Sequence, residues 1–103
     1  MDLRAQTLAN RQFRYVLLTI PDSFQLVLMS LQPKEEIGME KHPGTTQFIY
    51  IEAGCGIAII GNRHLALGPG SSVTIPPDTY HNIINESSTS RMQLFTIYTP
   101  PEH

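Results

Sequence analysis

Turn-forming residues interrupt this chain at short, regular intervals, and they limit how long any regular element can be. Glycine and proline, often together, interrupt the sequence repeatedly, for example at Pro33, Pro43-Gly44, Gly61-Asn62, Gly68-Pro69-Gly70 and Pro76-Pro77. The segments between these breaks are short and rich in β-branched and apolar residues, which favour strands over helices. The pattern predicts an all-β protein of about eight short strands, arranged as a sandwich or a small barrel.

The segments with the clearest strand character share turn residues at their ends, and they span 24–31, 47–52, 56–60, 63–67, 72–75, 80–85 and 92–98. Gly61-Asn62 is a two-residue hairpin signal between two of them. Bulky and mostly β-branched residues of these segments are expected inside the barrel and between its sheets: Ile49, Ile51, Ile57, Ile59, Val73, Ile75, Ile83, Leu94 and Phe95.

The chain has 103 residues, of which 41% are hydrophobic and 16% are charged. A chain of this length buries roughly two-thirds of its unfolded surface in one core and cannot fill two cores. We therefore expect residues 1–13 to form an N-terminal arm or short helix, and residues 14–103 to form a single β-barrel domain.

Charge and cysteine content exclude several classes of protein. The net charge is −2 and there is no basic run, so no electrostatic footprint for nucleic acid or an anionic membrane surface is present. No apolar run approaches ~18 residues, and the polar start has no signal-peptide core. A lone cysteine, Cys55, excludes an intrachain disulfide and makes a reducing, cytoplasmic location the expectation.

Two histidines stand out as candidate ligands. The chain has four, His42, His64, His81 and His103. We expect His64 to be exposed on a hairpin strand, and His103 is the terminal residue. If a strand extends as far as His42, then Glu40 and His42 point to the same face, because side chains alternate along a strand. The following turn would then bring Gln47 opposite His42.

Two imidazole nitrogens and one carboxylate oxygen form a ligand set that binds a catalytic divalent metal and leaves positions open for water, substrate or dioxygen. A glutamine carbonyl is a weak fourth ligand, or an acceptor for a metal-bound water. Composition alone also permits two unrelated histidines about 40 residues apart, so the residues leave both interpretations open.

The arrangement of these residues resembles the two sequence motifs of the cupin family. Residues 38–42, Gln47 and Gly54 are similar to the first motif, in which a glycine precedes His-x-His, a glutamate and a second glycine. Residues 70–85 are similar to the second motif, with His81 at its histidine. The resemblance implies a cupin double-stranded β-helix, a jelly-roll-like barrel, across residues 24–100.

Carried over position by position, the resemblance implies metal ligands at Glu40, His42, Gln47 and His81. The sequence departs from the family pattern at three positions: Glu40 replaces the first histidine, Gln47 replaces the usual glutamate, and Asp78 replaces a turn glycine. The ligand set keeps one carboxylate and two imidazoles, since the carboxylate has only changed place. Aspartate also accepts turn geometries.

Cupins include isomerases, dioxygenases and sugar-binding domains, so the fold does not give one function. The resemblance implies a small cupin that binds a divalent transition metal, which is Fe, Mn, Ni, Co, Cu or Zn. The expected function is a metal-dependent enzyme of isomerase or dioxygenase type that acts on a small polar metabolite. A sugar phosphate would need more cations than Lys41 and Arg63. The alternatives are a non-catalytic small-molecule or sugar-binding cupin, and a metal-free scaffold; in each case a homodimer is expected.

Overall fold

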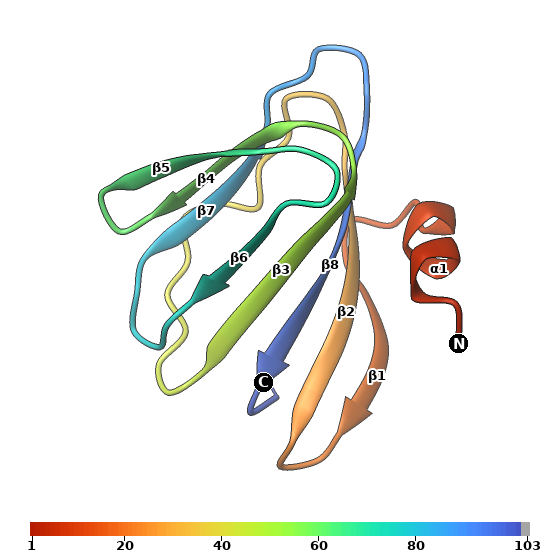
Figure 1. The fold of residues 1–103 in the computed structure, drawn as a ribbon. Helices are drawn as coiled ribbons and strands as arrows, with labels where there is room; N and C mark the ends of the chain where they lie inside the picture. The colour runs from red at the N-terminus through yellow and green to blue at the C-terminus, as the bar shows by residue number, and fades with distance from the viewer. Residues whose placement is uncertain (102–103) are drawn as a thin grey trace.

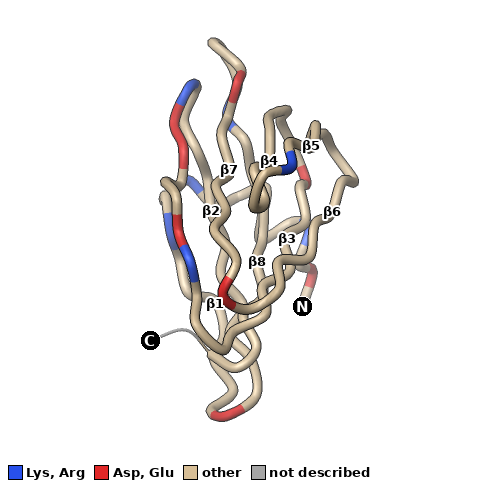
Figure 2. The backbone as a smooth tube through the Cα atoms, turned by 90° about the vertical axis from the view of Figure 1, so that its left-hand side faces the viewer, with Lys and Arg blue, Asp and Glu red and all other residues tan. Residues whose placement is uncertain are grey.

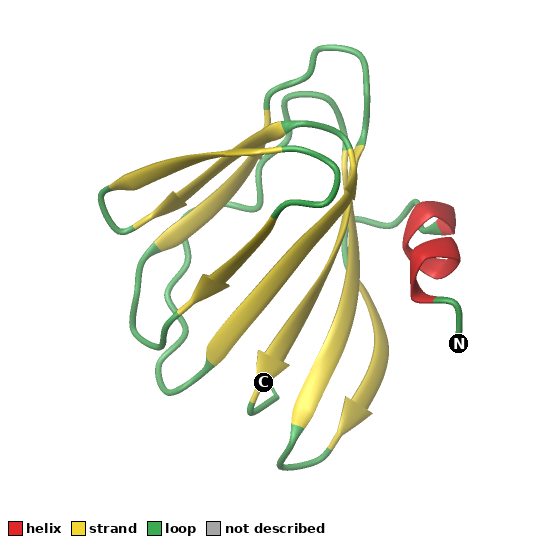
Figure 3. Cartoon of the chain, in the orientation of Figure 1, coloured by secondary structure: helices red, strands yellow, loops and turns green. Residues whose placement is uncertain are grey.

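The structure is a computed structural model that describes residues 1–101, so His103 lies outside the described residues. One short helix precedes eight strands (Figure 1, Figure 3): α1 (Leu3–Ala9), β1 (Tyr15–Ile20), β2 (Phe24–Leu31), β3 (Thr46–Ala53), β4 (Gly56–Ile60), β5 (Arg63–Leu67), β6 (Ser72–Ile75), β7 (His81–Asn85) and β8 (Met92–Thr99). The all-β prediction is confirmed.

The strands form two antiparallel sheets that face each other. One sheet has five strands in the order β1-β2-β8-β3-β6, and the other has three in the order β5-β4-β7. The sheets approach each other at one end and splay apart at the other (Figure 1). Charged residues lie mostly in the turns and at the ends of the strands (Figure 2), as expected for a sandwich whose facing surfaces are apolar.

Strand positions follow the sequence closely. The expected segments 24–31, 56–60, 63–67 and 72–75 coincide with β2, β4, β5 and β6, and the other three differ by at most one residue at either end. Strand β1 was not expected as a separate element. Its apolar sequence has no alternation because it is an edge strand whose ends are exposed on both faces.

The core lies between the two sheets and contains most of the residues expected there. Six of the nine are buried: Ile49, Ile51, Val73, Ile75, Ile83 and Leu94. Each such side chain contributes about 1.5–3 kcal/mol on burial. The prediction was wrong for Ile57, Ile59 and Phe95, which are only half-buried. In β4 the buried residue is Ala58, paired with Ile83, so the flanking isoleucines point to the opposite face.

Helix α1 packs on the outer face of the five-stranded sheet. Its N-cap is Asp2, whose carboxylate accepts from the amide of Ala5 at 3.0 Å. The side chain of Gln93, which points outward from β8, donates to the carbonyls of Leu8 and Asn10 at 2.7 and 3.2 Å. Within residues 1–101, no helix has the length and apolar character needed to cross a membrane.

The segment before His42 does not form the regular strand that we expected. Between β2 and β3 it makes only two isolated bridges, Glu36 with Ile84 and Glu40 with His81. At Gly38 the backbone takes a φ of +103°, and its N–H donates to the side-chain oxygen of Asn82 at 2.8 Å instead of to a neighbouring strand. The positive φ breaks the ladder and leaves Glu40 in a short bridge beside β7.

Candidate metal centre

The backbone places Glu40 and His81 directly beside each other. The N–H of Glu40 donates to the carbonyl of His81 at 2.8 Å, and the N–H of His81 donates to the carbonyl of Glu40 at 2.9 Å. This reciprocal pairing is the hydrogen-bonded pair of an antiparallel ladder, in which the two side chains project on the same face. The pairing therefore brings together two residues that are far apart in the sequence.

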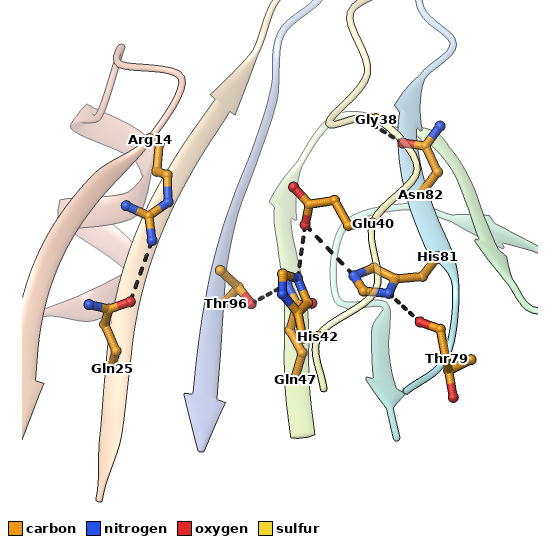
Figure 4. A network of polar contacts seen from close by, with 10 residues as sticks. All are labelled: Arg14, Gln25, Gly38, Glu40, His42, Gln47, Thr79, His81, Asn82 and Thr96. Atoms are coloured by element: carbon orange, nitrogen blue, oxygen red, sulfur yellow. Dashed lines mark hydrogen bonds and ion pairs between the residues drawn. The ribbon is translucent and has the colours of Figure 1, made fainter. Parts of the chain in front are cut away.

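Three potential metal ligands converge at this point (Figure 4). Oε2 of Glu40 lies 2.9 Å from Nε2 of His42 and 3.9 Å from Nε2 of His81. One potential ligand atom from each of the three residues lies within 4.8 Å of the others. The two imidazole rings are tilted by 45° with their centroids 5.1 Å apart. The shorter contact is a hydrogen bond that Nε2 of His42 donates to the carboxylate.

The imidazole of His81 is held in the tautomer that a metal ligand needs. Its Nδ1 lies 2.8 Å from the carbonyl oxygen of Thr79, and since a carbonyl only accepts, Nδ1 carries the proton. Nε2 therefore carries a lone pair, and this buried atom has no hydrogen-bond partner among the described residues.

Burial lowers the pKa of His81 below its ordinary value of 6.5, because desolvation penalises the charged ring. The bond to Thr79 and the charge of Glu40 oppose the shift, while His42 adds to it. The ring is therefore kept neutral, as a ligand must be.

Gln47 adds a second buried atom without a partner. Its side chain lies inside the sandwich, and Nε2 donates to the hydroxyl of Thr96 at 2.9 Å. In this orientation Oε1 is buried and has no hydrogen bond among the described residues. Contrary to expectation, Gln47 is not opposite His42: it pairs with Ile75 and Tyr98 across the sheet.

Tyr98 links Gln47 to the histidine cluster. It is the β8 partner of Gln47, and its ring meets the ring of His42 edge-on with the centroids 5.4 Å apart. The sequence gives no signal for this contact or for the hydrogen bonds of Thr79 and Thr96. All three residues are ordinary strand or turn types, and their roles depend on pairing between distant segments.

Solvent reaches the cluster from the Glu40 side. The exposed fraction is 36% for the side chain of Glu40, 12% for His42 and 3% for His81. Two imidazoles, one carboxylate and one amide oxygen suit a divalent transition metal. Two of these potential metal-ligating atoms, Nε2 of His81 and Oε1 of Gln47, are buried and have no hydrogen-bond partner among the described residues. The residues therefore fit the metal that the family resemblance implies.

Neighbouring motif residues have structural roles. Asn85 bonds to the backbone and not to the cluster: its Nδ2 donates to the carbonyls of Leu31, Gln32 and Ser90, and its Oδ1 accepts from the N–H of Ser87. Asp78 has a φ of +62°, which explains why a glycine is usual at this position. His64 is exposed on β5, as expected.

A separate hollow of about 420 Å³ lies between α1 and the outer face of β1 and β2. Its lining residues include Asn10, Gln12 and Tyr15, but no histidine, cysteine, aspartate or glutamate. Among the described residues, the group that could hold a metal, Glu40, His42 and His81, lies on the opposite side of the five-stranded sheet.

Comparison with known proteins identifies relatives of the whole chain. It is 45% identical over 107 aligned residues to an uncharacterized protein of Acanthamoeba polyphaga mimivirus, and 38% identical over 109 to the uncharacterized protein YrkC of Bacillus subtilis. Each match includes 100% of this chain, which spans 66% and 58% of the lengths of these two relatives.

A crystal structure from Bacillus halodurans is similar along the whole chain, with a TM-score of 0.94 and 35% identity, covering 100% of this chain and 81% of that one. A predicted oxalate decarboxylase from Thermotoga maritima has a TM-score of 0.71 at 19% identity and covers 76% of this chain and 67% of its own. A cupin sugar phosphate isomerase from Silicibacter pomeroyi has a TM-score of 0.68 at 16% identity, and the match covers 75% of this chain and 50% of that one. The last two show the fold alone.

Residues 27–98 match the family described as the Cupin domain. This range includes both sequence motifs and all the strands after β1. It leaves out only the first three residues of β2 and the last residue of β8. The eight antiparallel strands in two sheets are the jelly-roll barrel expected of that family. The chain belongs to the cupin family.

Proposed function

We propose that Glu40, His42, Gln47 and His81 bind one divalent transition metal, and that the protein is a small metal-dependent cupin acting on a small polar metabolite. The observation that carries the proposal is the pair of buried, unpartnered atoms, Nε2 of His81 and Oε1 of Gln47, among the described residues. Leaving such atoms unsatisfied costs about 1–3 kcal/mol each. A cation that accepts both lone pairs, together with the Glu40 carboxylate, removes that cost.

When bound, such a metal supplies Lewis-acid polarisation of a carbonyl or hydroxyl oxygen. Two hydrogen bonds within the protein orient the potential ligand atoms. The carbonyl of Thr79 holds the proton of His81 on Nδ1, and Thr96 orients the amide of Gln47. The Nε2–H group of His42 donates a hydrogen bond to the carboxylate of Glu40. Metal ligation through that nitrogen therefore requires the proton to leave.

The donor set supports a metal of the first transition series, with Fe, Mn, Co, Ni, Cu and Zn as candidates. Imidazole nitrogen suits iron, nickel, copper and zinc, whereas an all-oxygen site would suit Mg²⁺ or Ca²⁺. Three protein ligands and a weak fourth leave room for a substrate atom. An isomerase or dioxygenase reaction is compatible with this arrangement. Two structures of the same fold, a predicted oxalate decarboxylase and a sugar phosphate isomerase, suggest small oxygen-rich substrates.

The alternatives are a cupin that binds a metabolite without turnover and a metal-free scaffold. The two tyrosines nearest the motifs do not favour an acid or base role. Tyr50 stacks on Phe95 on the outer face, and Tyr80 is 57% exposed beneath the ammonium of Lys41. Turnover on a panel of keto-acids and sugars separates an enzyme from a binding protein, and metal content separates both from a scaffold.

The first experiment is elemental analysis of the purified protein after incubation with Fe²⁺, Mn²⁺, Ni²⁺ or Zn²⁺. We expect about one metal per chain, and loss of most of it in Glu40→Ala, His42→Ala and His81→Ala. His64→Ala removes an exposed histidine from β5 and serves as the control. Metal content far below one equivalent, or equal loss in His64→Ala, would refute the proposal.

We also propose that two copies of the chain associate through β1. This strand is an edge of its sheet, and Tyr15, Val16 and Ile20 on it are 42%, 39% and 41% exposed. Apolar side chains and unpaired backbone groups along an edge favour pairing with an identical strand. Light scattering should give a dimer for the wild type and a monomer for Val16→Lys. A monomeric wild type would refute the dimer.

A further inference from the structure

We propose that Arg14 is a specificity-determining residue, which binds the remote carboxylate of an anionic metabolite whose other end lies at the proposed metal. The inference rests on the proposed function and adds the class of ligand. It begins with a row of polar side chains that crosses the inner face of the five-stranded sheet.

Strand register defines this row. Thr19 of β1 pairs with Gln25 of β2, Gln25 pairs with Tyr98 of β8, and Tyr98 pairs with Gln47 of β3. Residues paired directly across antiparallel strands share a face. Since Gln47 is buried inside the sandwich, the whole row lies on the inner face, and it leads from the edge strand to the ligand cluster.

Gln25 holds Arg14 over this row. Nε2 of Gln25 donates to the hydroxyl of Thr19 at 3.2 Å, which turns Oε1 toward Arg14. Nη2 of Arg14 then donates to that oxygen at 3.4 Å (Figure 4). Gln25 is only 9% exposed, so the amide is a fixed acceptor on the wall of the sandwich. The guanidinium therefore lies on the same side of the sheet as Gln47 and the histidines.

Arg14 has binding capacity left over. A guanidinium has five N–H donors, and the single bond to Gln25 is long. Among residues 1–101, Arg14 forms no ion pair; the charged contacts found there join Arg4 to Glu52, and Glu40 to the two histidines. An exposed arginine without a carboxylate partner, on the wall that leads to a candidate metal, is suited to bind a carboxylate from a ligand.

Other cations near the motifs are not placed in this way. The ammonium of Lys41 lies 4.9 Å from the centre of the exposed Tyr80 ring, and Arg63 is at the tip of the β4–β5 hairpin. Because neighbouring strands are about 4.8 Å apart, Gln25 and Gln47 are roughly 10 Å apart across β8. The guanidinium is held by Gln25 and the proposed metal lies beside Gln47, so we propose a ligand with a chain of about five or six carbons for this span. One guanidinium matches one carboxylate, so we infer a monocarboxylate or dicarboxylate substrate.

The experiment is calorimetric titration of the metal-loaded protein with glutarate and adipate, and with glutaramide as the neutral analogue. In Arg14→Gln we expect the dissociation constant of a dicarboxylate to rise about tenfold or more, because a charge-assisted bidentate contact is lost. Arg14→Lys keeps the positive charge but loses the two parallel N–H donors of the guanidinium, so its dissociation constant should lie between those of the wild type and Arg14→Gln. Arg4→Gln, which removes the same charge from α1 on the outer face, should leave the affinity unchanged.

Metal content and thermal unfolding are measured on the same samples. Full metal content with no dicarboxylate binding, with equal binding of glutaramide, or with similar losses in Arg14→Gln and Arg4→Gln, would overturn this proposal and leave the metal site intact. A wild-type chain that takes up no metal would instead refute the proposed function, and the role of Arg14 would fall with it.

Discussion

The side chains of Gln47 and Thr96 are joined by a hydrogen bond, 2.9 Å long, that lies entirely inside the sandwich. An amide in place of the usual glutamate can present either its nitrogen or its oxygen to the interior, and here the nitrogen donates to Thr96. With the nitrogen committed to Thr96, the oxygen is the atom that remains buried and unpartnered among the described residues. The substitution therefore keeps an oxygen donor at this position.

Replacing Thr96 by valine should release that amide. Valine has nearly the same shape, but it cannot accept the bond from Gln47, so a buried donor loses its partner and the free energy of unfolding should fall by about 1–3 kcal/mol. Metal affinity should also fall, because the amide can then turn. Urea unfolding and metal titration test both effects. Thr96→Ser retains the hydroxyl and should behave nearly like the wild type; if it loses as much metal affinity as Thr96→Val, the orienting role is wrong.

Gln47→Glu restores the residue that is usual in the family. Without metal, a buried carboxylate at this position should lower the free energy of unfolding by about 1–3 kcal/mol, since its charge is desolvated. With metal, the same charge becomes a ligand, and the dissociation constant for Zn²⁺ should fall by about tenfold. Gln32→Glu adds the same charge at an exposed position. An equal gain in the control would show that net charge, and not ligation, is responsible.

The metal-free protein should lose stability as the pH falls below neutrality. The pKa of His81 is lowered on folding from its ordinary 6.5, so the unfolded chain takes up the proton first. Stability is therefore complete above pH 6.5, declines as the pH drops toward the folded pKa, and levels off below it. Urea unfolding in EDTA at about pH 7.5 and about pH 5.5 should show the decline. His81→Gln should reduce it, and an unchanged slope in this variant would contradict the assignment.

Asn85 should affect stability without affecting the metal. Its buried amide bonds to the end of β2, through the carbonyls of Leu31 and Gln32, and to the turn before β8, through the carbonyl of Ser90 and the N–H of Ser87. Asn85→Ala should lower the free energy of unfolding by at least about 2 kcal/mol, while the folded fraction keeps its metal. Asn62→Ala, in an exposed hairpin, should change stability by less than about 0.5 kcal/mol. Loss of metal from folded Asn85→Ala would make this residue part of the site.

Much of the fold could be predicted because its signals are local. Glycine and proline mark the turns, and the segments between them are short and β-branched, so seven strands were located to within a residue. The exception, β1, is an apolar edge strand without alternation. The faces of Ile57 and Ile59 were assigned wrongly because β-branched bulk favours a strand but does not say which side is covered. The smaller Ala58 occupies the inner position between them.

The sequence pattern predicts the wrong backbone around the candidate ligands. Glu40 and His42 converge as expected, with their oxygen and nitrogen 2.9 Å apart, but the expected strand is broken by the backbone at Gly38. Glu40 is positioned instead by its pairing with His81, a contact between segments that no local pattern reveals. The same is true of the bonds from Thr79 and Thr96. Residue types in motifs suggested the donors, whereas their protonation and orientation depend on the three-dimensional pairing.

The position of β8 has a consequence for how the protein is made. This strand is formed by the last residues of the barrel, yet it lies in the middle of the larger sheet, between β2 and β3. During synthesis from the N-terminus, β2 and β3 therefore leave the ribosome before β8, the strand that pairs with both of them. Thr96 and Tyr98 belong to the same strand, so the amide of Gln47 is locked only at that moment. A nascent chain that stops before β8 would expose two unpaired strand edges and would lack the hydrogen bond that orients Gln47.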